Sequence, residues 1–378
     1  MDGNHSSNSS LGEVAGFDLI EPWYAGNTTL IGGLSDKPED MYTHYLGIDL
    51  HKRSSTWVLV DANRSVIHKQ TVAVTPHNVS AGINALPVPV SGVKATLEPV
   101  CGWRWVQQQL IASGVTTITA NPTKVRLIAA SKHKTDTNDA RMLAELLASG
   151  YLPEAYRVSD AGLQLRSLAR ERYYLVSLRT SLKNRLKGIV TAYGLNEILE
   201  DCLTLRGRQY ITTHGHRELL DLHELIAEVT RYIKRTEETM APLVDQHSLT
   251  PILRTVPTVG PISTATLVAE IDDITRFPSA KQLTNYAGLV PGQRSSGERI
   301  RHGRITKVGS KYLRHTMVEC AMRLRQQHDP RLYAWYERVK SVSSPMKARV
   351  ALARKLLSII WYISTHHTPY TPRNHELG

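Results

Sequence analysis

The stretch that decides the fold is YLGIDLHKRSSTWVLVD, residues 45–61, which consists of two β-rich runs around a polar turn. Residues 66–74 supply a third run of the same kind. Val, Ile, Thr and Trp favour a pleated, half-buried surface, so these runs predict a β-meander. The first run contains Gly47-Ile48-Asp49, which places an acid near the end of a strand.

The residues after the meander add helices to this sheet. The pattern predicts a strand over 92–97, a helix over 103–113 and a short strand over 115–119. Three strands followed by a strand, a helix and a strand indicate a mixed α/β sheet.

Two long helical stretches fill residues 159–249. Leucine or isoleucine recurs every seven residues from Leu168 to Ile189, and after a break over 194–215 an alternating three-four spacing runs from Leu219 to Leu243. This pattern predicts an antiparallel helical hairpin or a dimeric coiled coil. The basic residues of the first helix either follow phosphates or keep the helix soluble. They are Arg166, Arg170, Arg172, Arg179, Lys183, Arg185 and Lys187.

Composition favours an anionic partner. The 378 residues carry a formal charge of +12, and residues 1–40 hold seven acids and one base. The rest of the chain therefore has 45 basic against 27 acidic residues, a charge of +18. This excess favours an anionic partner such as nucleic acid, and a solvated basic surface is the alternative. Residues 1–40, rich in Gly, Ser and Asn, are predicted to be a disordered leader, and residues 368–378 a frayed tail.

Cysteine usage and hydropathy predict a cytoplasmic protein. Cys101, Cys202 and Cys320 lie about a hundred residues apart, without metal-ligand spacing. They are interpreted as buried thiols in a reducing compartment. No apolar run approaches the roughly 18 residues that span a bilayer, and the chain does not begin with a secretory signal.

The C-terminal third is rich in arginine. Residues 256–261, VPTVGP, indicate a helix-hairpin-helix turn, a weak signal that packing hairpins share. Residues 287–304 form a Gly- and Ser-rich loop, and between residues 294 and 314 there are seven bases and one acid. This density suits a phosphate backbone. The predicted nucleic-acid-binding residues are Arg294, Arg299, Arg301, Arg304, Lys307, Lys311 and Arg314.

Four acids lie at strand ends or helix starts of the first domain: Asp49, Glu98, Asp136 and Asp139. Taken singly they have ordinary explanations, since Asp49 could simply end a strand and the other two aspartates could cap a helix. Together, carboxylates from two strands and one helix are what two Mg²⁺ ions need to hold the attacking and leaving oxygens of a phosphodiester. Mn²⁺ could replace Mg²⁺. Their order is typical of a ribonuclease H-like, RuvC-type nuclease core.

Five motifs, taken in order, resemble the insertion sequence 110 family of DEDD transposases. They are residues 47–49, 98–99, 134–140 (KTDTNDA), 256–261 and 288–297 (GLVPGQRSSG). The resemblance runs from about residue 41 to residue 367. It implies a RuvC-like domain over 41–158, a helical coiled-coil connector over 159–250 and a mainly helical C-terminal transposase domain over 251–367. One departure is Thr258, which stands where a glycine is expected.

The resemblance also implies a function, that of a DNA transposase or site-specific recombinase. Its acidic tetrad corresponds to Asp49, Glu98, Asp136 and Asp139, and its serine nucleophile to Ser296, with Ser295 as the alternative. A structured noncoding RNA, the bridge RNA, pairs with donor and target DNA in such systems, and several protomers act together.

Chemistry at the residues agrees with this reading. A serine attacks phosphorus poorly unless its proton is removed and positive charge stabilises the transition state, so the site would combine the acids with arginines such as Arg294. Two alternatives stay open: a RuvC-like nuclease that cleaves branched DNA with water, and a non-catalytic nucleic-acid-binding protein.

Overall fold

The described part of the chain forms two compact units, which divide between Arg157 and Val158. The computed structural model describes residues 41–128, 135–296 and 299–372; for residues 293–302 it describes the backbone of the strands only. The predicted leader over 1–40 lies outside the described residues.

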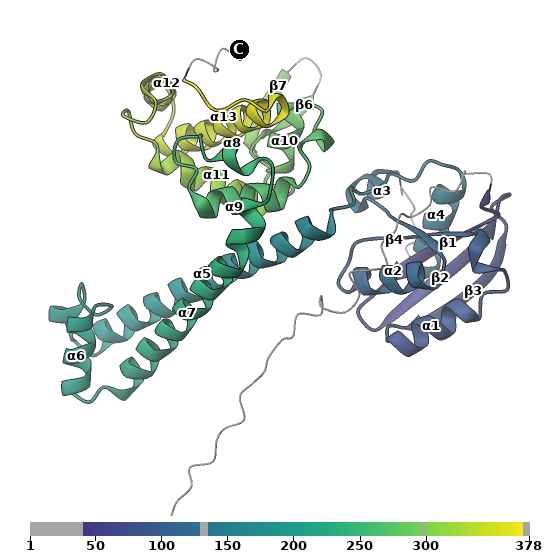
Figure 1. Cartoon of the computed structure of the whole chain (residues 1–378), viewed down its shortest axis with the longest axis horizontal. Coiled ribbons are helices and arrows are strands. Elements are labelled where there is room, and N and C mark those ends of the chain that lie inside the picture. Colours follow the sequence, from purple (N-terminus) through teal and green to yellow (C-terminus); the bar gives the residue numbers. More distant parts are fainter. Residues whose placement is uncertain (1–40, 129–134, 297–298, 373–378) are drawn as a thin grey trace, which may run out of the picture. The chain divides into compact units, whose positions relative to one another are not determined.

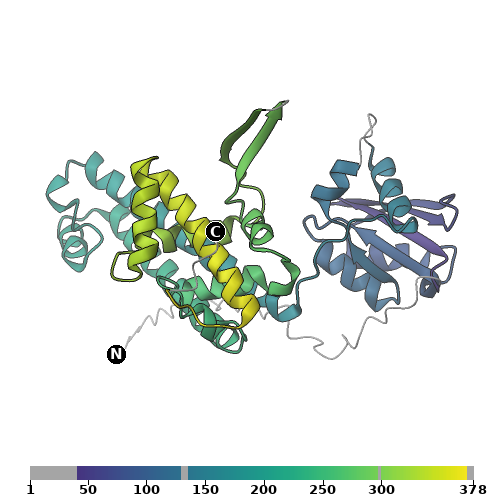
Figure 2. The ribbon, with the colours of Figure 1, turned by 90° about the horizontal axis from the view of Figure 1, so that it is seen from above.

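The first unit is a five-stranded sheet with helices on both faces (Figures 1 and 2). The strand order is β3-β2-β1-β4-β5; β1 pairs antiparallel to β2 and parallel to β4, so the predicted mixed α/β sheet is confirmed. The strands are β1 His44–Leu50, β2 Ser54–Asp61, β3 Val66–Ala73, β4 Val93–Leu97 and β5 Thr116–Thr119. The helices are α1 Pro76–Asn84, α2 Trp103–Ala112, α3 Pro122–Ile128 and α4 Asp136–Ala148.

Alternation along the central strands divides the core into two layers. In β1, Leu46 and Ile48 belong to the apolar cluster that includes Val79 of α1 and Val106 of α2. Tyr45 belongs to the opposite cluster, built on α4 and α3. Because successive strand residues point to opposite faces, the odd-numbered residues of β1 lie on the α4 side.

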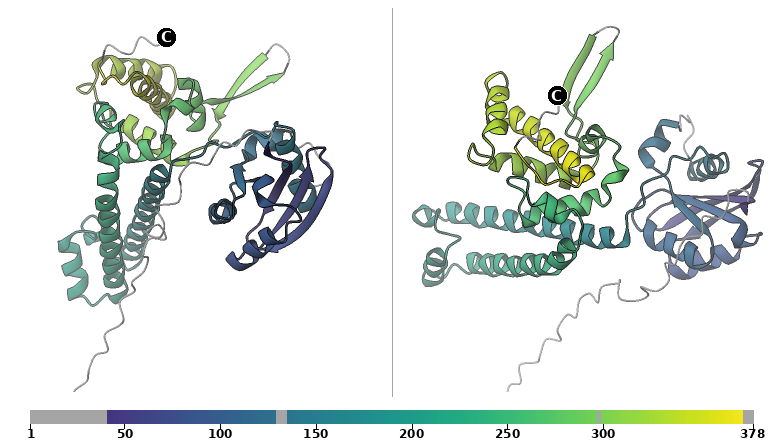
Figure 3. Two further views of the ribbon diagram at one scale, coloured as in Figure 1. Left: turned by 45° about the vertical axis from the view of Figure 1, so that its right-hand side comes forward. Right: turned by 45° about the horizontal axis from the view of Figure 1, so that its top comes forward.

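The second unit is almost entirely helical (Figures 1 and 3). Its helices are α5 Asp160–Ala192, α6 Leu205–Thr213, α7 Arg217–Asp245, α8 Thr250–Leu253, α9 Pro261–Ile271, α10 Ala280–Tyr286, α11 Lys311–Arg323, α12 Pro330–Ser341 and α13 Pro345–His366. Two strands, β6 Pro291–Ser296 and β7 Arg299–Ile305, form an antiparallel ribbon that projects from these helices (Figures 2 and 3). Within the described residues, no helix is long and apolar enough to cross a membrane.

The two long helices α5 and α7 lie side by side (Figures 1 and 3). On α7 most of the buried residues lie at the predicted positions, from Leu219 to Met240, but near the end Val244 is buried in place of Leu243. Thr236, which breaks the predicted spacing, is itself buried. On α5 the buried residues lie beside the predicted heptad instead of on it: Leu165 and Ala169 near one end, Leu186 and Val190 near the other. The structure therefore contains a helical pair, while its pairing with a second chain stays a prediction.

The C-terminal helices enclose the largest apolar cluster, to which α13 contributes Leu352, Leu356 and Ile360. The first residues after α13 return to this core. The Tyr370 hydroxyl donates to the buried carboxylate of Asp329, and burial raises the pKa of Tyr370 well above its ordinary value. Residues 368–372 thus differ from the frayed tail that the sequence predicts, because an aromatic ring finds a buried acceptor. Residues 373–378 lie outside the described part.

One thiol differs from prediction. Cys202 and Cys320 are buried, whereas Cys101 is exposed in the turn that precedes α2. The prediction of three buried thiols is wrong at this residue because the turn carries it to the surface.

Candidate metal centre and nucleic-acid interface

Asp49 lies near the end of β1, on the face that α4 covers. Leu46 and Ile48 are buried on the other face, and the Asp49 side chain retains 20% of its exposure. The strand thus ends with a carboxylate that is mostly withdrawn from water yet reachable from one side.

A close approach of α4 to β1 brings further acids to Asp49. A Cβ atom added to Gly47 would lie 2.0 Å from the Ala140 carbonyl oxygen and 2.6 Å from the Ala144 amide nitrogen. The helix can therefore rest against the strand only because position 47 has no side chain and α4 presents two alanines. Gly47 is the residue that sets this spacing.

The first turn of α4 carries Asp136 and Asp139. Thr135 caps the helix, because its side chain accepts a hydrogen bond from the Asn138 amide at 3.2 Å. The cap role is thus filled by Thr135, and Asp136 is directed elsewhere. Acids in a first turn also complement the positive end of the helix dipole.

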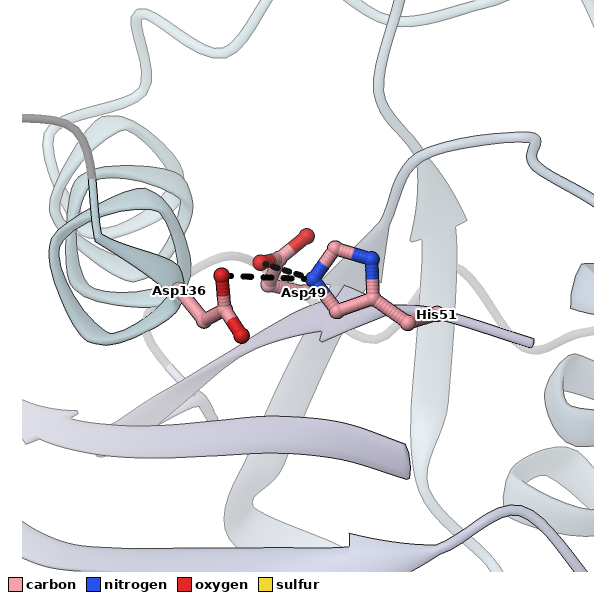
Figure 4. A group of neighbouring side chains, drawn as sticks. All are labelled: Asp49, His51 and Asp136. Carbon is pink, nitrogen blue, oxygen red and sulfur yellow. Dashed lines mark ion pairs between the residues drawn. The ribbon is translucent and has the colours of Figure 1, made fainter. Parts of the chain in front are cut away.

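Three side chains form a compact cluster: Asp49, His51 and Asp136 (Figure 4). His51 Nε2 lies 3.2 Å from Asp49 Oδ2 and 3.4 Å from Asp136 Oδ1. One donor atom from each residue lies within 4.8 Å of the others, which is compatible with a shared cation. His51 is a residue that the sequence reading missed. The available signal was its odd-numbered position two residues after Asp49, which continues the α4 face of the strand.

The remaining two predicted acids lie near this cluster without joining it. Asp139 acts on Asp49 electrostatically. Glu98 directly follows β4, whose Leu97 pairs with Ile48 of the parallel strand β1, so the backbone positions of Glu98 and Asp49 are neighbours at the carboxyl ends of their strands. Among the described residues, the group with donor atoms within 4.8 Å contains neither Glu98 nor Asp139.

Electrostatics at Asp49 favours a bound cation. Burial raises the pKa of Asp49 above its ordinary value, the carboxylates of Asp136 and Asp139 raise it further, and His51 offsets part of this rise. Ionised Asp49 is therefore energetically unfavourable unless positive charge lies beside it.

The donor set fits a divalent metal. Asp49 Oδ2 is buried, and its neighbour among the described residues is His51 Nε2 at 3.2 Å. Carboxylate oxygens suit Mg²⁺, and an added imidazole is tolerated better by Mn²⁺. Such an ion would be held by the carboxylates of Asp49 and Asp136. The His51 ring would either coordinate the ion or turn aside to make room for it.

The predicted serine loop is the β6–β7 ribbon of the second unit. The register pairs Ser296 with Arg299, Ser295 with Ile300, and Arg294 with Arg301. Side chains at these positions lie outside the described part of the chain.

The other predicted basic residues divide into two groups. Arg304, Lys307 and Lys311 are exposed. Arg314, in contrast, donates from Nη1 to the Ala287 carbonyl at 2.8 Å and braces the turn at Gly288, whose φ is 64°. Its role is at least partly structural.

Three arginines of α5 also have structural partners. Arg166 Nε donates to the Ala269 carbonyl at 3.0 Å, and Arg172 pairs with Glu237 at 2.6 Å. Arg170 pairs with Glu270 at 2.9 Å. The sequence offers two explanations for the basic residues of α5, binding to phosphates or keeping the helix soluble. Neither explains these three arginines, because their partners lie in α7 and α9.

The turn between α8 and α9 has an unusual residue. Thr258 adopts a φ of 69°, the left-handed region that favours glycine, which is why the sequence pattern anticipates glycine there. The Thr258 hydroxyl donates to the Cys320 carbonyl at 3.0 Å and offsets part of this strain. Gly260 and Pro261 then begin α9, as the VPTVGP motif predicts.

Comparisons with known proteins point in one direction. Residues 46–194 match a family of DEDD transposases from IS110 elements, described as "Transposase", and residues 250–337 match the family described as "Transposase IS116/IS110/IS902 family". The two matches fall on the acid-bearing sheet with α5, and on α8 to α12.

Individual relatives carry related names. The transposase for insertion sequence element IS1111A of Coxiella burnetii is 25% identical over 68% of this chain and 73% of its own length. The pilin gene-inverting protein of Moraxella bovis is 24% identical over 88% of this chain and 99% of its own length. A transposase homologue of Sinorhizobium fredii is 30% identical over 53% of this chain, and the matched part of this chain spans 50% of that relative's length.

Proposed function

This chain belongs to the IS110 family of DEDD transposases, and on that premise we propose that it cuts and rejoins donor and target DNA for an insertion element. The observation that carries the proposal is the cluster of Asp49, His51 and Asp136, which holds donor atoms for a divalent cation beside a fixed strand end. Glu98 and Asp139 complete the proposed tetrad.

The proposed role of the acids is to hold the cation against the reacting phosphodiester. A bound Mg²⁺ or Mn²⁺ would supply Lewis acidity and neutralise charge on the phosphoryl oxygens. The protein's own part is to fix the carboxylates, which Gly47 does by letting α4 rest on β1, and to keep Asp49 partly desolvated. A desolvated carboxylate interacts more strongly with a cation than an exposed one.

We assign the nucleophile to Ser296. Its Oγ would form a bond to phosphorus while the bond to the leaving deoxyribose oxygen breaks, the serine proton going to a base and a proton being taken up by the leaving oxygen. The phosphoserine bond conserves the energy of the cleaved linkage for rejoining, which hydrolysis by water would lose.

The ribbon register supports Ser296 over Ser295. Cross-strand partners share one face of an antiparallel ladder and successive residues alternate. Position 296 therefore belongs to the same ribbon face as positions 294, 299 and 301, all arginines, whereas position 295 belongs with Ile300. The backbone register thus groups position 296 with three arginine positions, which supports its assignment over position 295.

Two finer elements belong to the same proposal. A structured noncoding RNA, the bridge RNA, would pair with donor and target DNA and specify sequence while the protein holds backbones, as in other guided systems. Joining two duplexes would also need several copies of this chain. The basic excess is compatible with both.

A relative named for inverting pilin genes supports recombination over simple cleavage, because inversion requires cut ends to be rejoined. The rival is a metal-dependent nuclease that uses water on branched DNA. In that case the acids would suffice and Ser296 would be replaceable.

One experiment separates these functions. Purified protein is incubated with Mg²⁺, RNA transcribed from the noncoding sequence beside its gene, and paired donor and target DNA, and the products are resolved on a denaturing gel. The matched variants are Ser296→Ala, Ser295→Ala and Asp49→Asn. We expect a slow protein–DNA band and recombined product from the wild type and Ser295→Ala, and neither from the other two.

Other outcomes would contradict parts of the proposal. Normal cutting by Ser296→Ala without an adduct would identify a nuclease that uses water. An adduct lost only in Ser295→Ala would move the nucleophile by one residue. Recombination without added RNA would remove the guide.

A further inference from the structure

An aromatic cluster joins α5 to α11 in the second unit. The Tyr173 ring of α5 contacts two rings of α11, Tyr312 at a centroid distance of 5.0 Å and His315 at 5.1 Å. Both pairs are edge-to-face, with interplanar angles of 85°. Tyr312 and His315 are three residues apart, so they share one face of their helix. In an edge-to-face pair, the ring that contributes its edge keeps both of its faces uncovered by that partner.

Cations flank these rings. The Arg170 guanidinium carbon lies 4.9 Å from the Tyr312 ring centroid, and Lys311 Nζ lies 5.1 Å from it. His315 and Lys311 are exposed, and the Arg170 side chain retains 42% of its exposure. The cluster is therefore open to solvent at its basic rim.

A buried carboxylate fixes this arrangement. Glu270 of α9 is fully buried and accepts two hydrogen bonds from Arg170, at 2.9 and 3.2 Å. The same carboxylate accepts a hydrogen bond from the Ser310 hydroxyl at 3.0 Å, and Ser310 caps α11. One acid thus anchors both the arginine over Tyr312 and the helix end that carries Tyr312.

Fixed rings beside fixed cations match one ligand class. Nucleobases stack on aromatic faces regardless of sequence, and neighbouring cations attract the phosphates on either side of a stacked base. A paired base would be covered by its neighbours in the helix, so the ligand has unpaired bases.

We infer that Tyr173 and His315 form a stacking platform for an unpaired base of single-stranded nucleic acid, with the exposed Lys311 beside its phosphate. Tyr312, which has Arg170 over its ring, holds Tyr173 in place from the other helix. This inference rests on the proposed function at one point, that the chain binds nucleic acid. It is separate from the acidic cluster, because it lies in the second unit and needs no metal.

The test is fluorescence anisotropy with labelled oligonucleotides of about 20 nucleotides in EDTA, so that the acidic cluster plays no part. Three probes are compared: oligo-dT, oligo-rU and an abasic strand with the same number of phosphates. The variants are Tyr173→Leu, His315→Ala and Tyr173→Phe, with Tyr174→Leu as the matched control. Tyr174 is the next residue on α5, is 64% exposed and belongs to none of these ring pairs.

We expect Tyr173→Leu or His315→Ala to weaken binding of oligo-dT or oligo-rU by about 5- to 100-fold and to change abasic binding less than about twofold. Tyr173→Phe, which keeps the ring, and Tyr174→Leu should bind like the wild type. The strand that loses more affinity identifies DNA or RNA as the source of the base.

Two results would overturn the inference. Equal losses for base-bearing and abasic strands would show that the cluster contacts only phosphates. Unchanged affinity in both variants, with melting temperatures within a few degrees of the wild type, would show that the rings serve only packing. Neither result would bear on DNA cleavage, which is measured with Mg²⁺.

Discussion

Gly47→Ala is the substitution that most directly tests how the metal centre is assembled. The new Cβ would lie 2.0 Å from the Ala140 carbonyl oxygen, and both that atom and the next nearest, the Ala144 amide, belong to the backbone of α4. Neither can rotate away, so α4 must move outward by about 1 Å or more to restore ordinary van der Waals separation. Asp136 moves with the helix, whereas Asp49 stays on the strand.

The expected consequences are a loss of metal affinity and a loss of stability. Overpacking of a close helix–strand contact costs about 1–3 kcal/mol in free energy of unfolding. A displacement of about 1 Å between positioned groups lowers the rate of a reaction that depends on them by about 100-fold. Mn²⁺ affinity by titration calorimetry, unfolding by urea and the gel assay for cleavage measure the three effects.

Gly188→Ala is the matched control. Gly188 lies within α5, and an added Cβ meets no atom within 4 Å there. Alanine is the better helix former, so this variant should gain up to about 1 kcal/mol. If Gly47→Ala bound Mn²⁺ and unfolded like the wild type, the close packing of α4 on β1 would not be what positions the acids.

Three further substitutions test other parts of the structure. Asp49→Asn should remove the rise in melting temperature that Mn²⁺ causes, yet stabilise the metal-free protein by up to about 1 kcal/mol near neutral pH. Because the pKa of Asp49 is raised, the stability gained by the variant over the wild type should grow as pH rises above about 4 and vanish below it. Glu270→Gln should lower the free energy of unfolding in urea by about 2–3 kcal/mol, since it weakens two charge-assisted bonds to Arg170, and a change below about 0.5 kcal/mol would show that the pair is unimportant. Tyr370→Phe should cost about 1 kcal/mol through the lost hydrogen bond to Asp329, and because the pKa of Tyr370 is raised, the wild type's advantage should shrink as pH rises above about 10; a constant difference up to pH 12 would refute this.

The sheet was predictable because its signals are local. The alternating runs around Asp49 and the single helix between two short strands fix the strand count and connections without long-range information. The same locality placed Asp136 in a helical first turn. An acid at the end of a strand and an acid at the start of a helix can therefore be nominated as a pair from sequence.

Other features depend on residues far apart in the chain. The role of Gly47 depends on Ala140, more than ninety residues away, so in the sequence it is simply a glycine in a strand. Arg170 has the same appearance as a phosphate-binding residue until Glu270, one hundred positions later, is found beneath it. His51 looked like part of a polar turn, because its proximity to Asp136 arises only when α4 packs on β1.

The most direct test of the central claim is anomalous diffraction from crystals of this protein soaked in Mn²⁺. The account predicts an anomalous peak between the carboxylates of Asp49 and Asp136, with the His51 ring either coordinating it or turned aside, and no such peak in Asp49→Asn crystals. A peak that persists in Asp49→Asn, or ordered Mn²⁺ only elsewhere in the molecule, would contradict the assignment of these acids as a metal centre.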